Sequence, residues 1–335
     1  MRVSWDNARN IINSGDNAGD IIVIGDNARN IITSGDNAGD IIVSGDNAGN
    51  MSVSGDNVSD IIVSGDIAGD IIVSGDNAGN MSVSGDNVSD IIVGGDIAGD
   101  IKVSWDSVSN SIVSGDMAGD IIVSRDNVSD IIVSGDNASD IIVSGDIGGD
   151  IIVSRDNAGI IRVNGDNTGD IIVYSEDNAG DMRVNGDNIG NIILVNGDNV
   201  GIIRVSGDNA GDIIDSGDNA GIIRVSGDNV SDIIVSGDNE GIIRVSGDNT
   251  GDIKVYSGDN AGIIRVSGDN AGDIIKVNGD NVGIIRGSGD NIGNIIVSGD
   301  YAGYVSAEDD NAGDKSVIDD NTDVMRSNLV AMLLI

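Results

Sequence analysis

The sequence of 335 residues contains no cysteine, histidine, proline or phenylalanine. Without cysteine and histidine the chain has no disulfide, no thiolate nucleophile, no imidazole base and none of the metal sites that these residues build. Any catalysis would depend on carboxylates, and nothing in the sequence distinguishes one aspartate from the dozens of others. We therefore expect a protein that is not an enzyme.

Basic residues are also scarce, with 17 lysines and arginines against 56 acidic residues and a formal net charge of -39. This charge repels phosphate-rich partners, so we expect no binding to nucleic acid. Cations and basic surfaces are the expected partners. The first residues, "MRVSWDNARN", lack the apolar core of a signal peptide. The final "NLVAMLLI" is too short to span a bilayer, which needs about 20 apolar residues. The sequence predicts no membrane span and indicates no compartment.

The chain consists instead of one decapeptide in about 33 variants. The copy "GDNAGDIIVS" at residues 35–44 defines slots one to ten. Slot seven is isoleucine or methionine in nearly every copy, as in Ile41 and Met51, and slot nine is nearly always valine, as in Val43. Slot eight, between them, also accepts charge, as in Lys102 and Arg224. This alternation predicts a short strand over slots six to ten, with slots seven and nine buried and slot eight exposed.

The remaining slots have the composition of a turn, because glycine, aspartate and asparagine accept the backbone conformations that turns require. Slot four is usually small or apolar, as in Ala38, Val58 and Ile292, and we expect it to close the core from the turn side. A strand of this length cannot bury its apolar side alone, so successive copies must stack. The sequence therefore predicts an all-β fold, a parallel β-solenoid built from tandem decapeptides.

Two longer repeat patterns in the sequence bear on the number of decapeptides in each coil. Between positions 201 and 286 the copies alternate between "IIRV" and "DII" types, a rhythm of two decapeptides that suits a coil of two facing strands. The segment 45–74, however, recurs almost unchanged at 75–104, a rhythm of three decapeptides that suits a three-sided coil. We expect two copies per coil, and a three-sided coil or a single-layer antiparallel meander is the alternative. We assign the repeats to residues 1–302, and degenerate repeats with a C-terminal tail to 303–335.

Slot two is aspartate in every recognisable copy. One interpretation is structural, in which each carboxylate accepts hydrogen bonds from nearby backbone amides in an Asx-type turn. The other is a column of cation ligands, because hard cations bind carboxylate and carbonyl oxygens and these turns supply both. Calcium is the candidate cation. The candidate metal ligands are Asp36, Asp46, Asp56, Asp66, Asp76, Asp86, Asp208 and Asp218.

The repeat resembles the glycine- and aspartate-rich nonapeptides of RTX proteins, whose turns bind calcium in a parallel β-roll. The resemblance lies in the leading Gly35, in Asp40 before the strand and in the branched apolar Ile42. The period here is ten rather than nine, and Asp36 and Ala38 stand where that family has glycine. The resemblance implies calcium at the turns and a buried side chain in slot eight.

Three functions fit these features. The first is a structural or adhesive repeat rod, stabilised by divalent cations on the aspartate column and able to associate end to end. The second is a binder of ice, mineral or polysaccharide, which would need one uniform outward column; "SNSIVS" at residues 109–114 and the arginine-bearing copies count against it. The third is a translated minisatellite without an evolved function. It is suggested by core slots that hold unsuitable residues, namely the polar Asn13 and Asp215 and also Gly287 and Glu240.

Overall fold

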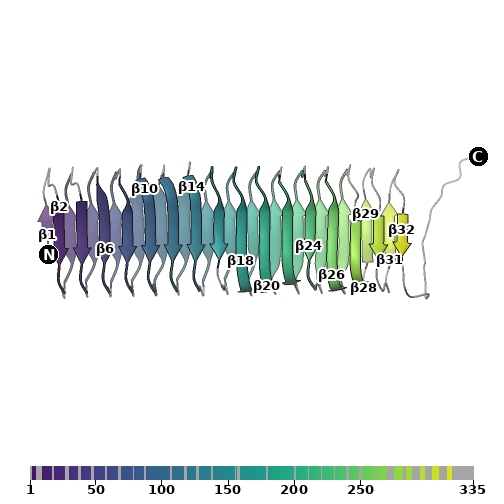
Figure 1. Ribbon diagram of the computed structural model, residues 1–335, viewed down its shortest axis with the longest axis horizontal. Coiled ribbons are helices and arrows are strands. Elements are labelled where there is room, and N and C mark those ends of the chain that lie inside the picture. Colours follow the sequence, from purple (N-terminus) through teal and green to yellow (C-terminus); the bar gives the residue numbers. More distant parts are fainter. Residues whose placement is uncertain are drawn as a thin grey trace, which may run out of the picture. The chain divides into compact units, whose positions relative to one another are not determined.

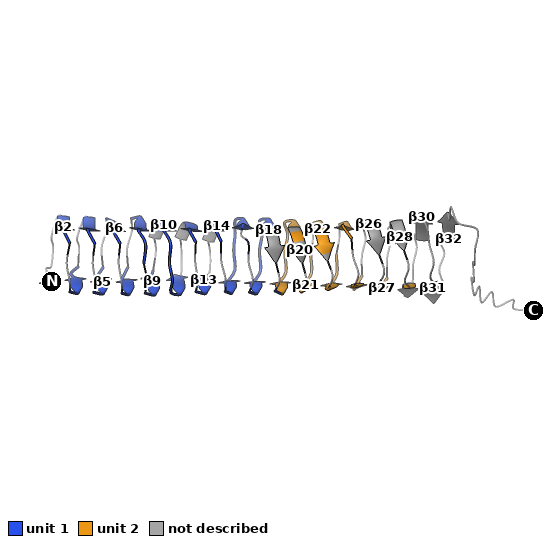
Figure 2. Cartoon of the chain, turned by 90° about the horizontal axis from the view of Figure 1, so that it is seen from below, with its two compact units in different colours: residues 1–180 blue, residues 181–335 orange. Residues whose placement is uncertain are grey.

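The computed structural model describes the repeats with gaps at some turns and at the C-terminal end. The described residues are 2–4, 10–16, 19–26, 30–36, 39–46, 49–56, 59–66, 69–77, 79–86, 88–105, 108–116, 119–125, 128–136, 139–154, 156, 159–178, 180–199, 201–209, 211–219, 221–229, 231–238, 241–248, 251–260, 262–269, 275–281, 284–288, 295–298, 304–308 and 315–318. They fall into two compact units, residues 1–180 and 181–335, which Figure 2 colours separately.

In the first unit, odd-numbered and even-numbered strands form two different sheets (Figure 1). The odd-numbered strands are β1 (Arg2–Ser4), β3 (Ile21–Ile24), β5 (Ile41–Ser44), β7 (Ile61–Ser64), β9 (Met81–Gly85), β11 (Ile101–Trp105), β13 (Ile121–Arg125), β15 (Ile141–Ser144) and β17 (Ile161–Asn164). The even-numbered strands are β2 (Asn10–Ser14), β4 (Asn30–Ser34), β6 (Asn50–Ser54), β8 (Ile71–Ser74), β10 (Val88–Gly94), β12 (Val108–Ser114), β14 (Val128–Ser134), β16 (Ile151–Ser154) and β18 (Ile171–Asn178).

The second unit has the same construction. Its odd-numbered strands are β19 (Met182–Asn185), β21 (Ile202–Ser206), β23 (Ile222–Ser226), β25 (Ile242–Ser246), β27 (Ile263–Ser267), β29 (Ile284–Ser288) and β31 (Tyr304–Glu308). Its even-numbered strands are β20 (Ile192–Asn199), β22 (Ile213–Asn219), β24 (Ile233–Ser236), β26 (Ile253–Asn260), β28 (Ile275–Asn281), β30 (Ile295–Ser298) and β32 (Lys315–Ile318). The degenerate repeats after residue 302 thus still form strands, since β31 pairs with β29 and β32 with β30.

The strand pairing confirms a parallel β-solenoid with two decapeptides per coil. Ile41 in β5 lies opposite Ile61 in β7, and Met51 in β6 lies opposite Ile71 in β8, both in parallel register. Strand partners are two decapeptides apart in the sequence, with one extra position where the chain carries an insertion. A three-sided coil would place partners three decapeptides apart, and a meander would make them antiparallel. Neither alternative agrees with the observed register.

The core is formed by slots seven and nine, as the alternation predicts. Ile41 and Val43 are both 0% exposed, and the same two slots are buried in coil after coil of each unit. Slot eight points outward, because Lys102 is exposed and Arg224 is half-buried. Ile42 is also in slot eight and half-buried, so the buried position that the RTX resemblance implies for it is wrong. Isoleucine and valine suit slots seven and nine because β-branched side chains pack well on a pleated surface.

The expectation for slot four is wrong, because slot three closes the core instead. Ala38, Val58 and Ile292 themselves lie outside the described residues. In other copies, however, the slot-four side chains of Ala98 and Ile189 are exposed, the latter by 66%. The preceding slot-three side chains point inward. Most of them are asparagines, and the exposed fraction of the described ones is 3% or less for Asn77, Ile97, Ile147, Asn167, Asn188, Asn209 and Asn229.

In the second unit the buried asparagines form a hydrogen-bonded ladder. Nδ2 of Asn188 donates to Oδ1 of Asn209 at 3.1 Å, and Nδ2 of Asn209 donates to Oδ1 of Asn229 at 3.1 Å. Each Nδ2 also donates to the carbonyl oxygen of the glycine two positions earlier, at 3.0 Å from Asn209 to Gly207. Identical side chains can satisfy one another in this way only when coils stack in register. The ladder therefore both needs and stabilises the coil of two decapeptides.

Several core slots hold polar side chains, as the sequence indicates for Asn13 and Asp215. Asn13 is 8% and Asp215 5% exposed, and Thr33 and Ser111 are fully buried. The hydroxyls of Thr33 and Ser111 have no hydrogen-bond partner among the described residues. Buried polar groups without partners cost free energy. Gly287 and Glu240, the two other unsuitable residues expected in core slots, lie outside the residues whose burial is described.

Candidate functional site

The slot-two aspartates lie in two columns, because each coil contains two turns. Asp36, Asp56 and Asp76 are one coil apart in the column that precedes the odd-numbered strands, whereas the candidates in the other column precede the even-numbered strands. Those are Asp46, Asp66 and Asp86. In the second unit, Asp208 and Asp218 are divided between the two columns in the same way. All eight candidate ligands are exposed.

Each column is connected by hydrogen bonds between coils. The backbone N–H of Asp56 donates to Oδ1 of Asp36 at 3.3 Å, and that of Asp76 donates to Oδ1 of Asp56 at 3.4 Å. In the second unit the N–H of Asp228 donates to Oδ1 of Asp208 at 3.1 Å. The structural interpretation of slot two is thus partly right, since the carboxylate does accept a backbone amide, but the amide belongs to the next coil. Alanine in slot two would lose this bond.

Slot six forms further columns of the same kind, which were not among the residues predicted from the sequence. The N–H of Asp120 donates to Oδ1 of Asp100 at 3.1 Å, and the N–H of Asp170 donates to Oδ1 of Asp150 at 2.9 Å. Asparagine replaces aspartate without loss of the bond, as in the 2.9 Å bond from the N–H of Asp100 to Oδ1 of Asn80. The signal was present in the sequence, because slot six is aspartate or asparagine in most copies.

These columns place like charges close together. Adjacent strands in a sheet lie about 4.8 Å apart, and two unit charges at that distance repel by roughly 0.9 kcal/mol in bulk water. Salt at physiological concentration reduces this repulsion between exposed groups. The hydrogen bond from the next coil offsets part of what remains, since a backbone amide that donates to a carboxylate stabilises its charge.

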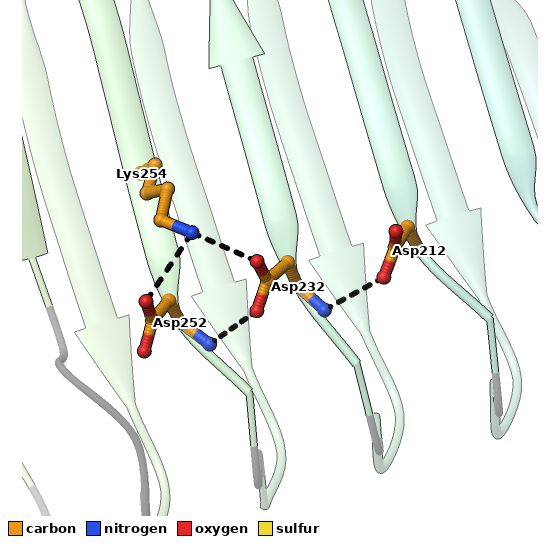
Figure 3. A network of polar contacts seen from close by, with 4 residues as sticks. All are labelled: Asp212, Asp232, Asp252 and Lys254. Carbon is orange, nitrogen blue, oxygen red and sulfur yellow. Dashed lines mark hydrogen bonds and ion pairs between the residues drawn. The ribbon is translucent and has the colours of Figure 1, made fainter.

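One cation lies within a slot-six column, on the even-numbered strands of the second unit (Figure 3). Nζ of Lys254 is 2.8 Å from Oδ2 of Asp232 and 3.2 Å from Oδ2 of Asp252. The N–H of Asp252 also donates to Oδ1 of Asp232 at 2.8 Å. The Lys254 hydrogen bond, with that backbone amide, lowers the pKa of Asp232, and the bond to Asp232 raises the pKa of Lys254 to about 12. A lysine can therefore bridge two coils by neutralising their carboxylates.

The described residues supply carboxylates for calcium, but these carboxylates do not converge on one point. Among the residues that the structure describes, no three acidic side chains lie together in a way that would hold a metal ion. The slot-two carboxylates are spread along the columns, one per coil, rather than gathered around a point. Calcium binding at Asp36 and the other candidates thus stays a prediction.

The outward face of the even-numbered strands in the first unit is nearly uniform. Its slot-eight positions lie in register and are isoleucine in every coil but one. Ser111 does not interrupt this column, because it is in slot seven and points inward, while Ile112 continues the outward column. The objection drawn from "SNSIVS" is therefore wrong. The column consists of Ile12, Ile32, Ser52, Ile72, Ile92, Ile112, Ile132, Ile152 and Ile172.

The described part of the chain contains no helix long and apolar enough to cross a membrane. The chain matches no protein-family model, and searches of curated proteins and of solved structures return no significant match.

Proposed function

We propose that the chain is a non-enzymatic structural repeat protein whose coils stack through hydrogen-bonded columns of aspartate and asparagine. The observation that supports this most directly is the repetition of the same inter-coil bond, as between Asp36 and Asp56 and again between Asp208 and Asp228. Polar side chains that an enzyme would gather at one place are here distributed evenly, one per slot in each decapeptide. Such side chains stabilise a repetitive scaffold.

A coil-deletion series tests this proposal. In a repeat protein each coil contacts its neighbours, so stability is approximately the sum of similar contributions. Removal of residues 55–74 deletes one whole coil and keeps the alternation of the two sheets. We expect the shortened protein to keep its β-sheet circular dichroism and to unfold at nearly the same temperature. The matched comparison is a deletion of residues 55–64 alone, which removes one decapeptide and moves every later strand to the other sheet. Unfolding of the whole-coil deletion would contradict interchangeable coils.

A second function, binding to a flat solid or polymer surface, is favoured by the isoleucine column of the first unit. Its members are exposed or half-buried, as with Ile72 at 38% exposure, and they repeat at the spacing of the coils. A regular apolar face of this kind is unusual on a soluble surface and is typical of an interaction site.

Adsorption measurements separate this second function from the first. The variant Ile92→Lys/Ile112→Lys/Ile132→Lys carries charges on the uniform column, and Ile42→Lys/Ile122→Lys/Ile142→Lys carries the same charges on the odd-numbered strands. If the uniform column binds ice, calcite or crystalline cellulose, only the first variant loses retention on that material. Equal retention of both variants and the native protein on all three materials would contradict surface binding.

A further inference from the structure

The odd-numbered strands of the second unit carry an arginine in slot eight of successive coils. Arg204 lies opposite Arg224, and Arg224 opposite Arg244, in parallel register. Their spacing is that of adjacent strands, about 4.8 Å. We call the whole set the arginine ladder; it consists of Arg183, Arg204, Arg224, Arg244, Arg265 and Arg286.

Most arginines of the ladder have no carboxylate in slot six of their own decapeptide. Arg183 is paired with Asp181 in slot six at 2.8 Å. In the following coils slot six is isoleucine instead, as in Ile202 and Ile222 beside Arg204 and Arg224. Among the described residues, the side chains of Arg204, Arg224 and Arg244 make no hydrogen bond or ion pair, and their Nε atoms are buried without an acceptor.

The even-numbered strands of the same unit show what a slot-eight cation can do where slot six keeps its aspartates. Lys254 there binds both Asp232 and Asp252 (Figure 3). Arg204, Arg224 and Arg244 lack this local neutralisation although the chain carries a net charge of -39. A run of parallel guanidinium groups without counter-charges attracts an anion from outside the coil, and a matching row of carboxylates suits it best.

The chain itself presents such a row. In the first unit the slot-two column before the odd-numbered strands is exposed, and its Oδ1 atoms accept the amides of the next coil. The other carboxylate oxygen has no hydrogen-bond partner within the described ranges for any of five successive members. These are Asp36, Asp56, Asp76, Asp96 and Asp116. We call this set the aspartate column.

We propose that the arginine ladder binds the aspartate column of a second copy of this chain, one guanidinium to each carboxylate. Both rows rise by one strand spacing per coil, so a match at one coil continues through the next coils without a change of register. The contact joins two different surfaces and is therefore heterologous. It is lateral, whereas the sequence suggested end-to-end association. The proposal goes beyond the structural role given above and does not depend on it.

The net charge adds a salt dependence that distinguishes this contact. At about 0.01 M salt the Debye length is about 30 Å, so the two copies, each at -39, repel one another as wholes. At about 0.15 M the Debye length is about 8 Å, which screens the distant charges but acts less on pairs in direct contact. At about 1 M the pairs themselves weaken. Association is thus strongest at intermediate salt.

Sedimentation velocity of the full chain tests the proposal by complementation. The ladder variant is Arg204→Gln/Arg224→Gln/Arg244→Gln, and the column variant is Asp56→Asn/Asp76→Asn/Asp96→Asn, in which asparagine keeps the Oδ1 acceptor. We expect the native protein to associate at intermediate salt and each variant alone to associate at least about tenfold more weakly. An equimolar mixture regains a heterodimer, because one variant supplies the column and the other the ladder.

The control variant Arg2→Gln/Arg125→Gln/Arg155→Gln removes the same charge at positions that do not belong to the ladder, and we expect it to associate like the native protein. Circular dichroism confirms that all variants are folded. The proposal is overturned if the native protein stays monomeric at every salt concentration, if the mixture stays monomeric, or if the control loses association equally. A native monomer that binds inorganic polyphosphate, with binding lost in the ladder variant alone, would show that the partner is a separate polyanion and would also overturn it.

Discussion

Asn209 donates a hydrogen bond of 3.1 Å from its buried Nδ2 to Oδ1 of Asn229, which occupies the same slot in the next coil. Replacement of Asn209 by isoleucine breaks the ladder on both sides and leaves polar atoms of Asn188 and Asn229 buried without that partner. We expect Asn209→Ile to lower the free energy of unfolding by about 2 kcal/mol. Urea denaturation followed by circular dichroism measures the change.

Asn77 provides the matched comparison, because it occupies the same slot but lies opposite Ile97. Its Nδ2 is buried and has no partner among the described residues, although its Oδ1 accepts the N–H of Gly79 at 3.3 Å. Asn77→Ile removes the unpaired amide and adds an apolar contact with Ile97, so we expect a gain of about 1 kcal/mol. Changes of the same sign in both variants would contradict the role assigned to the ladder.

The buried carboxylate of Asp215 leads to a second prediction. Asp215 is 5% exposed in slot nine, between Leu194 and Val235 of the adjacent coils. Asp215→Val restores an apolar side chain there, and we expect the free energy of unfolding to rise by about 1–3 kcal/mol. The exposed Asp218→Val serves as control and gives no such gain. An unchanged denaturation midpoint for Asp215→Val would mean that the carboxylate is not costly at this position.

The Lys254–Asp232 pair predicts a limited pH dependence. Because both side chains are partly exposed, we expect Lys254→Met to lower the free energy of unfolding by no more than about 1 kcal/mol at pH 7. The pKa of Asp232 is lowered from 3.8, so the stabilisation is present above about pH 4 and is lost as pH falls through the lower folded value. The pKa of Lys254 is raised to about 12, so the stabilisation is also lost as pH rises through that value.

Urea denaturation between pH 2 and pH 7 checks this sign. The difference between the native protein and Lys254→Met should shrink as the solution becomes more acidic. Lys102→Met is the control, since Lys102 is an exposed slot-eight lysine for which the structure shows no ion pair within the described residues. A difference for Lys254→Met that stays constant down to pH 2 would rule out the ion pair as its source.

Close approach of the backbones at slot one gives a fourth prediction. Gly35 has φ +117°, and a Cβ there would lie 2.5 Å from the carbonyl oxygen of Gly15. We expect Gly35→Ala to destabilise the protein by about 1–3 kcal/mol, because both the backbone conformation and the space exclude a side chain. Gly94→Ala is the control, since its Cβ would meet nothing closer than 3.4 Å. Equal melting temperatures for the two variants would contradict this account.

Charge along the aspartate columns gives the fifth prediction. We expect the melting temperature at pH 7 to be lower in chelator than in millimolar calcium, because bound cations would reduce the repulsion between neighbouring carboxylates. Thermal melts followed by circular dichroism under these conditions decide the point. If the curves coincide, the inter-coil hydrogen bonds alone satisfy the columns, and the cation interpretation is dropped.

The sequence predicted the strand slots because their side chains differ in polarity in a way that the alternation makes visible. The slots of Ile41 and Val43 are almost always apolar, whereas slot eight between them accepts Lys102. The inward slot three was not predictable by this reasoning. Asparagine at Asn209 has the appearance of a turn residue, and it becomes a core residue only because Asn188 and Asn229 satisfy its amide from neighbouring coils.

The candidate site was predicted in the same incomplete way. The constancy of aspartate in slot two indicated a required acceptor, but a single repeat cannot reveal that the donor lies in the next coil, as for Asp36 and Asp56. The absence of local partners for Arg224 was likewise hidden. Which side chains lie beside Arg224 depends on which decapeptides pair in one sheet. That pairing depends on the number of decapeptides per coil, for which the sequence contains two conflicting repeat patterns.

Because each coil contains two decapeptides, the sheet on which a duplicated pattern lies depends on whether an even or an odd number of decapeptides is duplicated. Met51 lies in β6, on the even-numbered strands, and its counterpart Met81 in the duplicated segment lies in β9, on the odd-numbered strands. A duplication of three decapeptides is an odd step, so it transfers a pattern to the opposite face of the protein. A duplication of two or four decapeptides keeps the pattern on its own face. Continuous ladders such as Arg204, Arg224 and Arg244 can therefore be lengthened only by even steps, and odd steps mix the two faces.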